Sequence, residues 1–154
     1  MNRREVFGAL GATAVALGTY TSAQAQTAKK SEKEGDHHGG HFDTCAKACA
    51  DCQLECHSCQ HHCGDLVVEG KKDHIKTMKL CADCGDICAV AANITARHGT
   101  LSATVCEACA KACDECGKAC SQFTDDEHMK KCADECKKCA AACREMAKHI
   151  GMSH

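Results

Sequence analysis

Cysteine occupies the positions of this chain that the helices of a bundle normally fill with apolar side chains. In residues 45–63, successive cysteines are four, three, four, three and four positions apart. At that spacing side chains share one face of an α-helix. All 18 cysteines lie in four such stripes, namely Cys45, Cys49, Cys52, Cys56, Cys59 and Cys63, then Cys81, Cys84 and Cys88, then Cys106, Cys109, Cys113, Cys116 and Cys120, then Cys132, Cys136, Cys139 and Cys143. Since bundle helices usually carry Leu, Ile or Val there, the pattern predicts four helices whose thiols face a shared interior.

Capping residues and glycines set the expected limits of the helices. We expect them to run from Asp43 or Thr44 to Val68, from Asp73 to Gly99, from Thr100 or Ser102 to Phe123, and from the run Thr124–Glu127 to Gly151. Asp, Thr and Ser cap helix N-termini, glycine ends helices, and acids suit the first turn. The connections are short, so neighbouring helices should be antiparallel. The predicted fold is all-α, an antiparallel up-down-up-down four-helix bundle with a cysteine-lined core.

Composition agrees with one helical domain over residues 44–150. The 154 residues include no proline, and aromatic residues make up 3%. This favours long helices over a sandwich or barrel. The net charge is −2 and no basic stripe is interleaved with aromatic residues, so we expect no nucleic-acid partner.

Residues 1–25 are predicted to be a targeting leader. Arg3 and Arg4 precede a moderately apolar, Gly- and Ala-rich run, and an A-x-A cleavage site ends at Ala25. The run is too short and too weakly apolar to span a membrane comfortably. The paired arginines resemble a twin-arginine (Tat) signal, with a general secretory signal as the alternative. The mature protein is therefore expected to be exported to a bacterial periplasm.

Residues 26–43 read as a disordered tether, because they combine charge, glycine and histidine without periodicity. His37, His38 and His41 either bind a metal loosely or are simply solvated, and the second interpretation is favoured.

A second stripe on the second predicted helix is apolar. It contains Leu80, Ile87, Val90 and Ile94 and does not face the thiols. Such a stripe packs against a flanking helix or forms a contact between subunits, and the sequence leaves both interpretations open.

The chemistry of the thiols depends on their partners. Within one stripe, Cβ atoms lie about 5–6 Å apart, whereas a disulfide needs about 3.5–4.5 Å, so only bridges between stripes remain open. Four thiolates at one point suit zinc or an iron–sulfur cluster. A long row of thiolates instead suits Cu(I), a soft ion that binds two sulfurs, because each thiolate can bridge two neighbouring ions. Bridging would give about one ion per cysteine, on the order of 18 ions.

The motif CxxxCxxC, beginning at Cys45 and again at Cys132, occurs in the stripes. Over about residues 43–150 the chain resembles the bacterial copper storage proteins, and its leader resembles that of their exported branch. The resemblance implies a bundle that stores many Cu(I) ions and a homo-oligomer, commonly a tetramer.

Metal is expected to enter at an end of the bundle through weaker ligands than thiolate. One end gathers His74, Met78, His128 and Met129 beside Cys63, Cys81, Cys120 and Cys132; the other gathers His41, His98 and Met146 beside Cys45, Cys106 and Cys143. The first end is favoured as the entrance.

No enzyme is expected, because no Cys–His–Asn constellation stands apart from the stripes and no Glu-x-x-His motif lies on an inward helix face. The alternatives to copper storage are a zinc- or cadmium-sequestering protein like metallothionein and a disulfide-stapled structural bundle. Copper donor or acceptor proteins are the expected partners.

Overall fold

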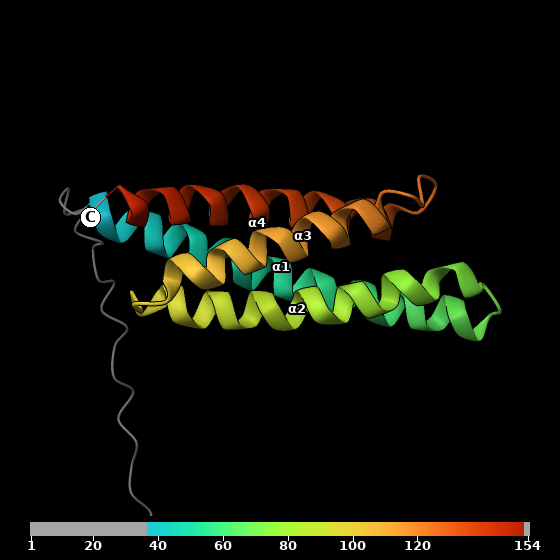
Figure 1. Cartoon of the computed structure of the whole chain (residues 1–154). Coiled ribbons are helices and arrows are strands. Elements are labelled where there is room, and N and C mark those ends of the chain that lie inside the picture. Colours follow the sequence, from blue (N-terminus) through green and yellow to red (C-terminus); the bar gives the residue numbers. More distant parts are fainter. Residues whose placement is uncertain (1–36, 153–154) are drawn as a thin grey trace, which may run out of the picture. The chain divides into compact units, whose positions relative to one another are not determined.

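Four α-helices make up the fold of residues 37–152, which are the residues that the computed structural model describes. They are α1 (His37–Val68), α2 (Ile75–Ala96), α3 (Ser102–Cys120) and α4 (Glu127–Gly151), with one 3-10 turn, η1 (Lys72–His74), before α2 (Figure 1). The all-α prediction is confirmed. The predicted leader, residues 1–25, and residues 26–36 of the predicted tether lie outside the described residues.

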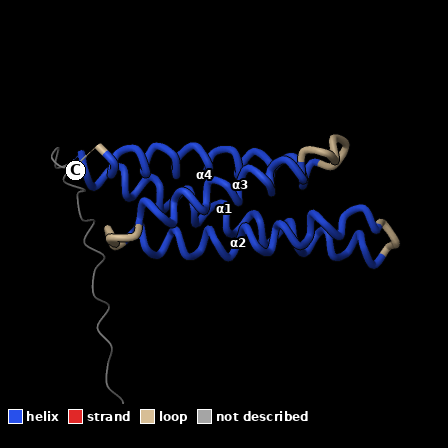
Figure 2. Tube along the Cα trace, in the orientation of Figure 1, coloured by secondary structure: helices blue, strands red, loops and turns tan. Residues whose placement is uncertain are grey.

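The helices run up and down in turn. The three connections lie at alternate ends of the helices (Figure 2). α1 packs against α2 and α4, and α3 packs against the same two helices, whereas the diagonal pairs make no close backbone contact within the described part of the chain. The space enclosed between the diagonals is therefore left to side chains, as in other four-helix bundles.

α1 begins earlier than its capping residues predict. Thr44 does not cap the helix, because its hydroxyl donates a hydrogen bond of 2.6 Å to the Gly40 carbonyl one turn earlier. Phe42 stacks on His98 at the end of α2, with ring centroids 4.2 Å apart. The bundle thus supports a turn that the local sequence, rich in glycine and histidine, does not favour by itself.

The other helix limits lie near the predicted ones. Gly70 follows α1 with φ of 94°, a left-handed conformation that glycine adopts without strain. Asp126, two residues after the Thr124 that opens the predicted run, caps α4, since its Oδ1 accepts hydrogen bonds from the backbone N–H groups of His128 and Met129, at 2.9 and 3.2 Å. α3 ends at Cys120, three residues before the expected end.

The core consists largely of thiols. Every cysteine side chain is at most 1% exposed. Met129 and Met146 are the largest other side chains that are fully buried. Gly117 allows α3 and α4 to approach closely, because a Cβ atom there would lie 3.2 Å from the Cβ of Cys136. None of the described helices is long and apolar enough to cross a membrane.

Candidate metal centre

The four cysteine stripes meet in one column along the inside of the bundle. Their helical period turns each stripe inward, and the packing of the helices then sets which thiols meet. The Sγ–Sγ separations across helices include 3.4 Å for Cys49–Cys143, 3.5 Å for Cys88–Cys109, 3.6 Å for Cys45–Cys106, 3.6 Å for Cys81–Cys116, 3.8 Å for Cys109–Cys139 and 4.0 Å for Cys59–Cys120. A metal–sulfur bond of about 2.3 Å allows two sulfurs on one ion to lie up to about 4.6 Å apart. These thiols are therefore close enough to share ions with little movement of the helices.

Pairs on a single helix are also close enough to hold an ion. The Sγ atoms four residues apart are separated by 3.9 Å for Cys52–Cys56 and by 4.0 Å for Cys84–Cys88 and Cys109–Cys113. One helix can thus offer a two-sulfur site before other helices contribute.

Groups of four thiols overlap along the column. In each of five groups all four Sγ atoms lie within 4.8 Å of one another: Cys49, Cys109, Cys139 and Cys143; Cys52, Cys56, Cys84 and Cys136; Cys52, Cys84, Cys88 and Cys113; Cys56, Cys116, Cys132 and Cys136; and Cys59, Cys81, Cys120 and Cys132. Several cysteines belong to two groups. Zinc prefers an isolated tetrahedral site, and each such site needs four ligands that it does not share. Overlap instead favours ions joined by bridging thiolates.

Hydrogen bonds among the thiols drive their pKa values apart. The hydrogen bonds of Cys52, of which the one with Cys113 has the largest effect, hold the pKa of Cys52 far below the usual range of a thiol. The pKa of Cys113 is raised, chiefly by its hydrogen bond to Cys109. The pKa of Cys59 is lowered to about 5, with Cys120 as the main cause. A thiol that accepts hydrogen bonds thus has its pKa lowered, and a thiol that donates them has its pKa raised.

Met129 and His74 lie at the end of the column favoured as the entrance. The Met129 Sδ is 3.3 Å from the Sγ of Cys59 and 3.9 Å from that of Cys63. His74 is 5% exposed, stacks on Phe123 with ring centroids 4.0 Å apart, and contacts the Cys63 thiol. Its buried Nδ1 has no hydrogen-bond partner among the residues that the structure describes. These two side chains can hand an ion to the last thiols of the column.

The structure places the other two predicted entrance residues differently. Met78 is half-buried against the core, with its Sδ close to Gly64. His128 instead faces α1, where its Nε2 lies 3.3 Å from the Ser58 hydroxyl and its ring stacks on His62. The structure thus brings His74 and Met129 to Cys63 but places His128 on the outer side of the α1–α4 pair.

The opposite end of the column is closed by side chains that are not thiols. The Oγ1 of Thr95, which is fully buried, lies 3.6 Å from the Sγ of Cys106. Met146 is 1% exposed at the same end. The His41 ring stacks on that of His149, with centroids 4.4 Å apart.

Sequence reasoning missed a polar cluster between α1 and α4. His62 lies off the cysteine face of α1, and its Nε2 donates to Asp126 at 2.7 Å. Glu55, also on α1, is only 7% exposed. The sequence signal for the cluster is slight, because Glu55 stands between Leu54, which is 70% exposed, and the buried Cys56.

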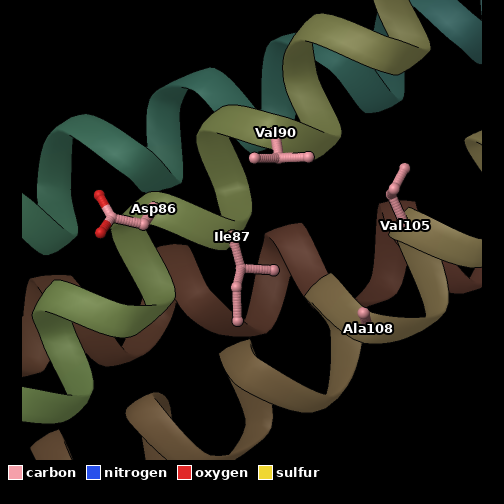
Figure 3. Close-up of a pocket in the computed structure, with 5 residues that line it drawn as sticks. All are labelled: Asp86, Ile87, Val90, Val105 and Ala108. Atoms are coloured by element: carbon pink, nitrogen blue, oxygen red, sulfur yellow. The ribbon is translucent and has the colours of Figure 1, made fainter.

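The apolar stripe of α2 forms part of a shallow groove. Ile87 and Val90 of α2 and Val105 and Ala108 of α3 line a cavity of about 290 Å³, with Asp86 at its edge (Figure 3). Ile87 packs partly against the core, whereas Val90 is 52% exposed. Packing within the bundle therefore accounts for Ile87 but leaves Val90 uncovered.

The buried four-thiol groups share cysteines along one column inside an antiparallel bundle. This arrangement defines a class of protein, the metal-binding four-helix bundles with soft ligands. The family model described as Csp, copper storage protein, matches residues 38–148. The chain belongs to the copper storage protein family.

Solved structures of similar proteins agree. The Cu(I)-bound copper storage protein BsCsp3 is 32% identical, with a TM-score of 0.64, over 70% of this chain and 98% of its own. A cytosolic copper storage protein from Streptomyces lividans, described with five coppers, is 27% identical, with a TM-score of 0.65, over 71% of this chain and 94% of its own. The Streptomyces lividans copper storage protein Ccsp, loaded with 10 copper equivalents, is 26% identical, with a TM-score of 0.66, over 76% of this chain and 93% of its own. Among proteins with curated descriptions, none matches the chain significantly.

Proposed function

We propose that this protein is a copper reservoir that holds many Cu(I) ions on the thiolates of its core. The observation that carries the proposal is the continuity of the column, in which neighbouring four-thiol groups share cysteines. Soft thiolate ligands select Cu(I), and bridging lets each sulfur serve two ions. The expected capacity is then about one ion per cysteine, on the order of 18 ions.

Ions enter at the end that contains His74 and Met129. Imidazole and thioether are weaker ligands than thiolate, so they bind an ion briefly and release it to Cys59 and Cys63. Met129 already contacts both thiols, and His74 contacts that of Cys63. Met78 lies nearby on α2 as a further thioether.

The protein acts by storage rather than catalysis, and it works in the periplasm after export. The support for export is the pattern of residues 1–25, with Arg3, Arg4 and the cleavage site ending at Ala25. N-terminal sequencing of protein from the periplasmic fraction tests this, since a start at Gln26 is expected. A full-length chain in the cytosol would contradict it.

The protein forms a homo-oligomer through the groove between α2 and α3. The support is an apolar lining from two helices and the exposed Val90. Copper donor or acceptor proteins then exchange ions at the ends of the bundles.

The main test is a titration of fully reduced protein with Cu(I) under anaerobic conditions, against a competing chelator. We expect tight binding to continue to many ions per chain. Saturation at about four ions or fewer, the content of one or a few isolated sites, would contradict the reservoir.

Zinc or cadmium sequestration is the second candidate, because the four-thiol groups have the ligand number that zinc prefers. Competition separates the two functions. Cu(I) should displace Zn(II) from the thiols completely, whereas Zn(II) that persists against excess Cu(I) would favour the second candidate.

A further inference from the structure

A histidine and carboxylate cluster lies between α1 and α4, apart from the thiol column. It consists of Glu55, Ser58 and His62 of α1 together with Asp126 and His128 at the start of α4. The rings of His62 and His128 stack, with centroids 4.6 Å apart and planes at 10°. We call these five residues the histidine cluster. Its donors are nitrogen and oxygen, unlike the sulfur donors of the column.

Glu55 is the unusual member of the histidine cluster. The residue is only 7% exposed. Its Oε2 pairs with the Lys131 ammonium at 2.5 Å. Its Oε1 is buried and has no hydrogen-bond partner within residues 37–152. An unpartnered buried carboxylate oxygen is costly and calls for a ligand.

The unpartnered oxygen faces an imidazole nitrogen. Oε1 of Glu55 lies 3.9 Å from Nε2 of His128, which is too far for a hydrogen bond. Two ligands that each lie about 2.0–2.2 Å from one metal ion are separated by roughly 3–4 Å. The space between these two atoms therefore has the width of a metal site.

The geometry points to a second metal site, in which Nε2 of His128 and Oε1 of Glu55 bind one divalent transition-metal ion such as Cu(II). The Ser58 hydroxyl, 3.3 Å from the same nitrogen, and water complete the coordination. Nitrogen and oxygen donors suit Cu(II), whereas thiolates select Cu(I). One bundle thus separates the two oxidation states of copper by ligand type.

His62 is a positioning residue of this site. Its Nε2 donates to Asp126 at 2.7 Å, and Asp126 in turn caps α4. The His62 ring is therefore held in place and supports the His128 ring by stacking on it. Such supporting contacts orient metal-binding imidazoles.

Lys131 should weaken metal binding, because its positive charge lies beside the proposed site. Its ammonium binds the same carboxylate, and its side chain is 69% exposed, so it can move into solvent when a cation enters. If Glu55 is a metal ligand, removing this positive charge should strengthen metal binding. If Glu55 has only a structural role, removing Lys131 should give no such gain.

The test uses the full chain, first filled with Cu(I) under anaerobic conditions so that the thiols are occupied, with the Cu(I) content measured. Cu(II) is then added and followed by electron paramagnetic resonance. We expect a Cu(II) signal with nitrogen hyperfine coupling from the histidine cluster. Glu55→Gln and His128→Asn should each weaken this binding by about tenfold or more, while Lys131→Gln should tighten it.

His61→Asn is the matched control, because His61 is on the same helix and its side chain is 78% exposed. It should leave the signal unchanged, and circular dichroism should show all variants folded. The inference is overturned if Glu55→Gln and His128→Asn bind Cu(II) as the parent does. It is also overturned if Lys131→Gln weakens the binding.

Discussion

The thioether sulfur of Met129 lies 3.3 Å from the thiol sulfur of Cys59, so a weak soft ligand contacts the column directly at one of its ends. A methionine that only filled space in the core would not require its sulfur atom to face a thiol. The contact supports the proposal that Met129 is the first or last side chain to bind an ion that crosses this end of the bundle.

Replacing Met129 with leucine should slow Cu(I) uptake without changing capacity by more than about one ion. If binding to the Met129 sulfur lowers the barrier to uptake by about 1 kcal/mol, its loss should slow uptake about fivefold. Leucine has a similar volume, so the free energy of unfolding should change by less than about 1.5 kcal/mol. Stopped-flow loading measures the rate. Met146→Leu at the other end is the control, and equal slowing by both variants would contradict an entrance at Met129.

Cys113 should matter more for capacity than a cysteine at the end of the column. Its Sγ lies 3.8 Å from that of Cys52, 3.7 Å from those of Cys84 and Cys88, and 4.0 Å from that of Cys109. If ions are bridged, Cys113→Ser should remove about two Cu(I) ions per chain, since each thiolate serves two ions. Anaerobic titration against a chelator measures the loss.

Cys63→Ser provides the comparison for that loss. Cys63 lies beside Met129 at the end of the column, so its replacement should remove about one ion or fewer. Identical losses for the two variants would argue for separate sites in place of bridged ions.

Asp126→Ala should destabilise the bundle in a way that depends on pH. Burial opposes ionisation of this carboxyl, but hydrogen bonds from His62 and from the backbone of Met129 outweigh it and lower the pKa of Asp126. Because the folded pKa is lowered, the stabilisation is complete above the usual value of about 3.9 and is lost as the pH falls through the folded value. At neutral pH the variant should lose about 1 kcal/mol of unfolding free energy.

Urea denaturation of the reduced, metal-free protein measures this difference. The difference in unfolding free energy between parent and variant should disappear as the pH falls below about 4. The exposed neighbour Asp125, replaced by alanine, should show little change at any pH. A gap for Asp126→Ala that stays constant down to acid pH would exclude the ionised cap as its cause.

Val90→Glu should dissociate the proposed homo-oligomer. Val90 is 52% exposed in the groove that it forms with Val105, and a buried carboxylate without a partner would destabilise an interface there. Analytical ultracentrifugation measures the mass. Val68→Glu, at an 88% exposed position at the end of α1, is the control. An unchanged mass for Val90→Glu would place any subunit contact elsewhere.

Much of this protein follows from its sequence. The spacing of the cysteines predicts four helices and an inward thiol face, because intervals of three and four residues put side chains on one face of a helix. Gly70 lies where local chemistry predicts the end of α1, and the cap of α4, Asp126, lies within the predicted run Thr124–Glu127. These features depend on interactions within a turn or two of one helix, so the local sequence contains the information.

Only the tertiary structure decided which side chains meet across helices. The register and rotation of α1 against α4 bring Glu55 and His62 to His128, and they place Cys49 within 3.4 Å of Cys143. The early start of α1 likewise depends on Phe42 stacking on His98. A helical period specifies the direction of a side chain around its own axis, but the shift and tilt of one helix along another come from packing of the whole bundle.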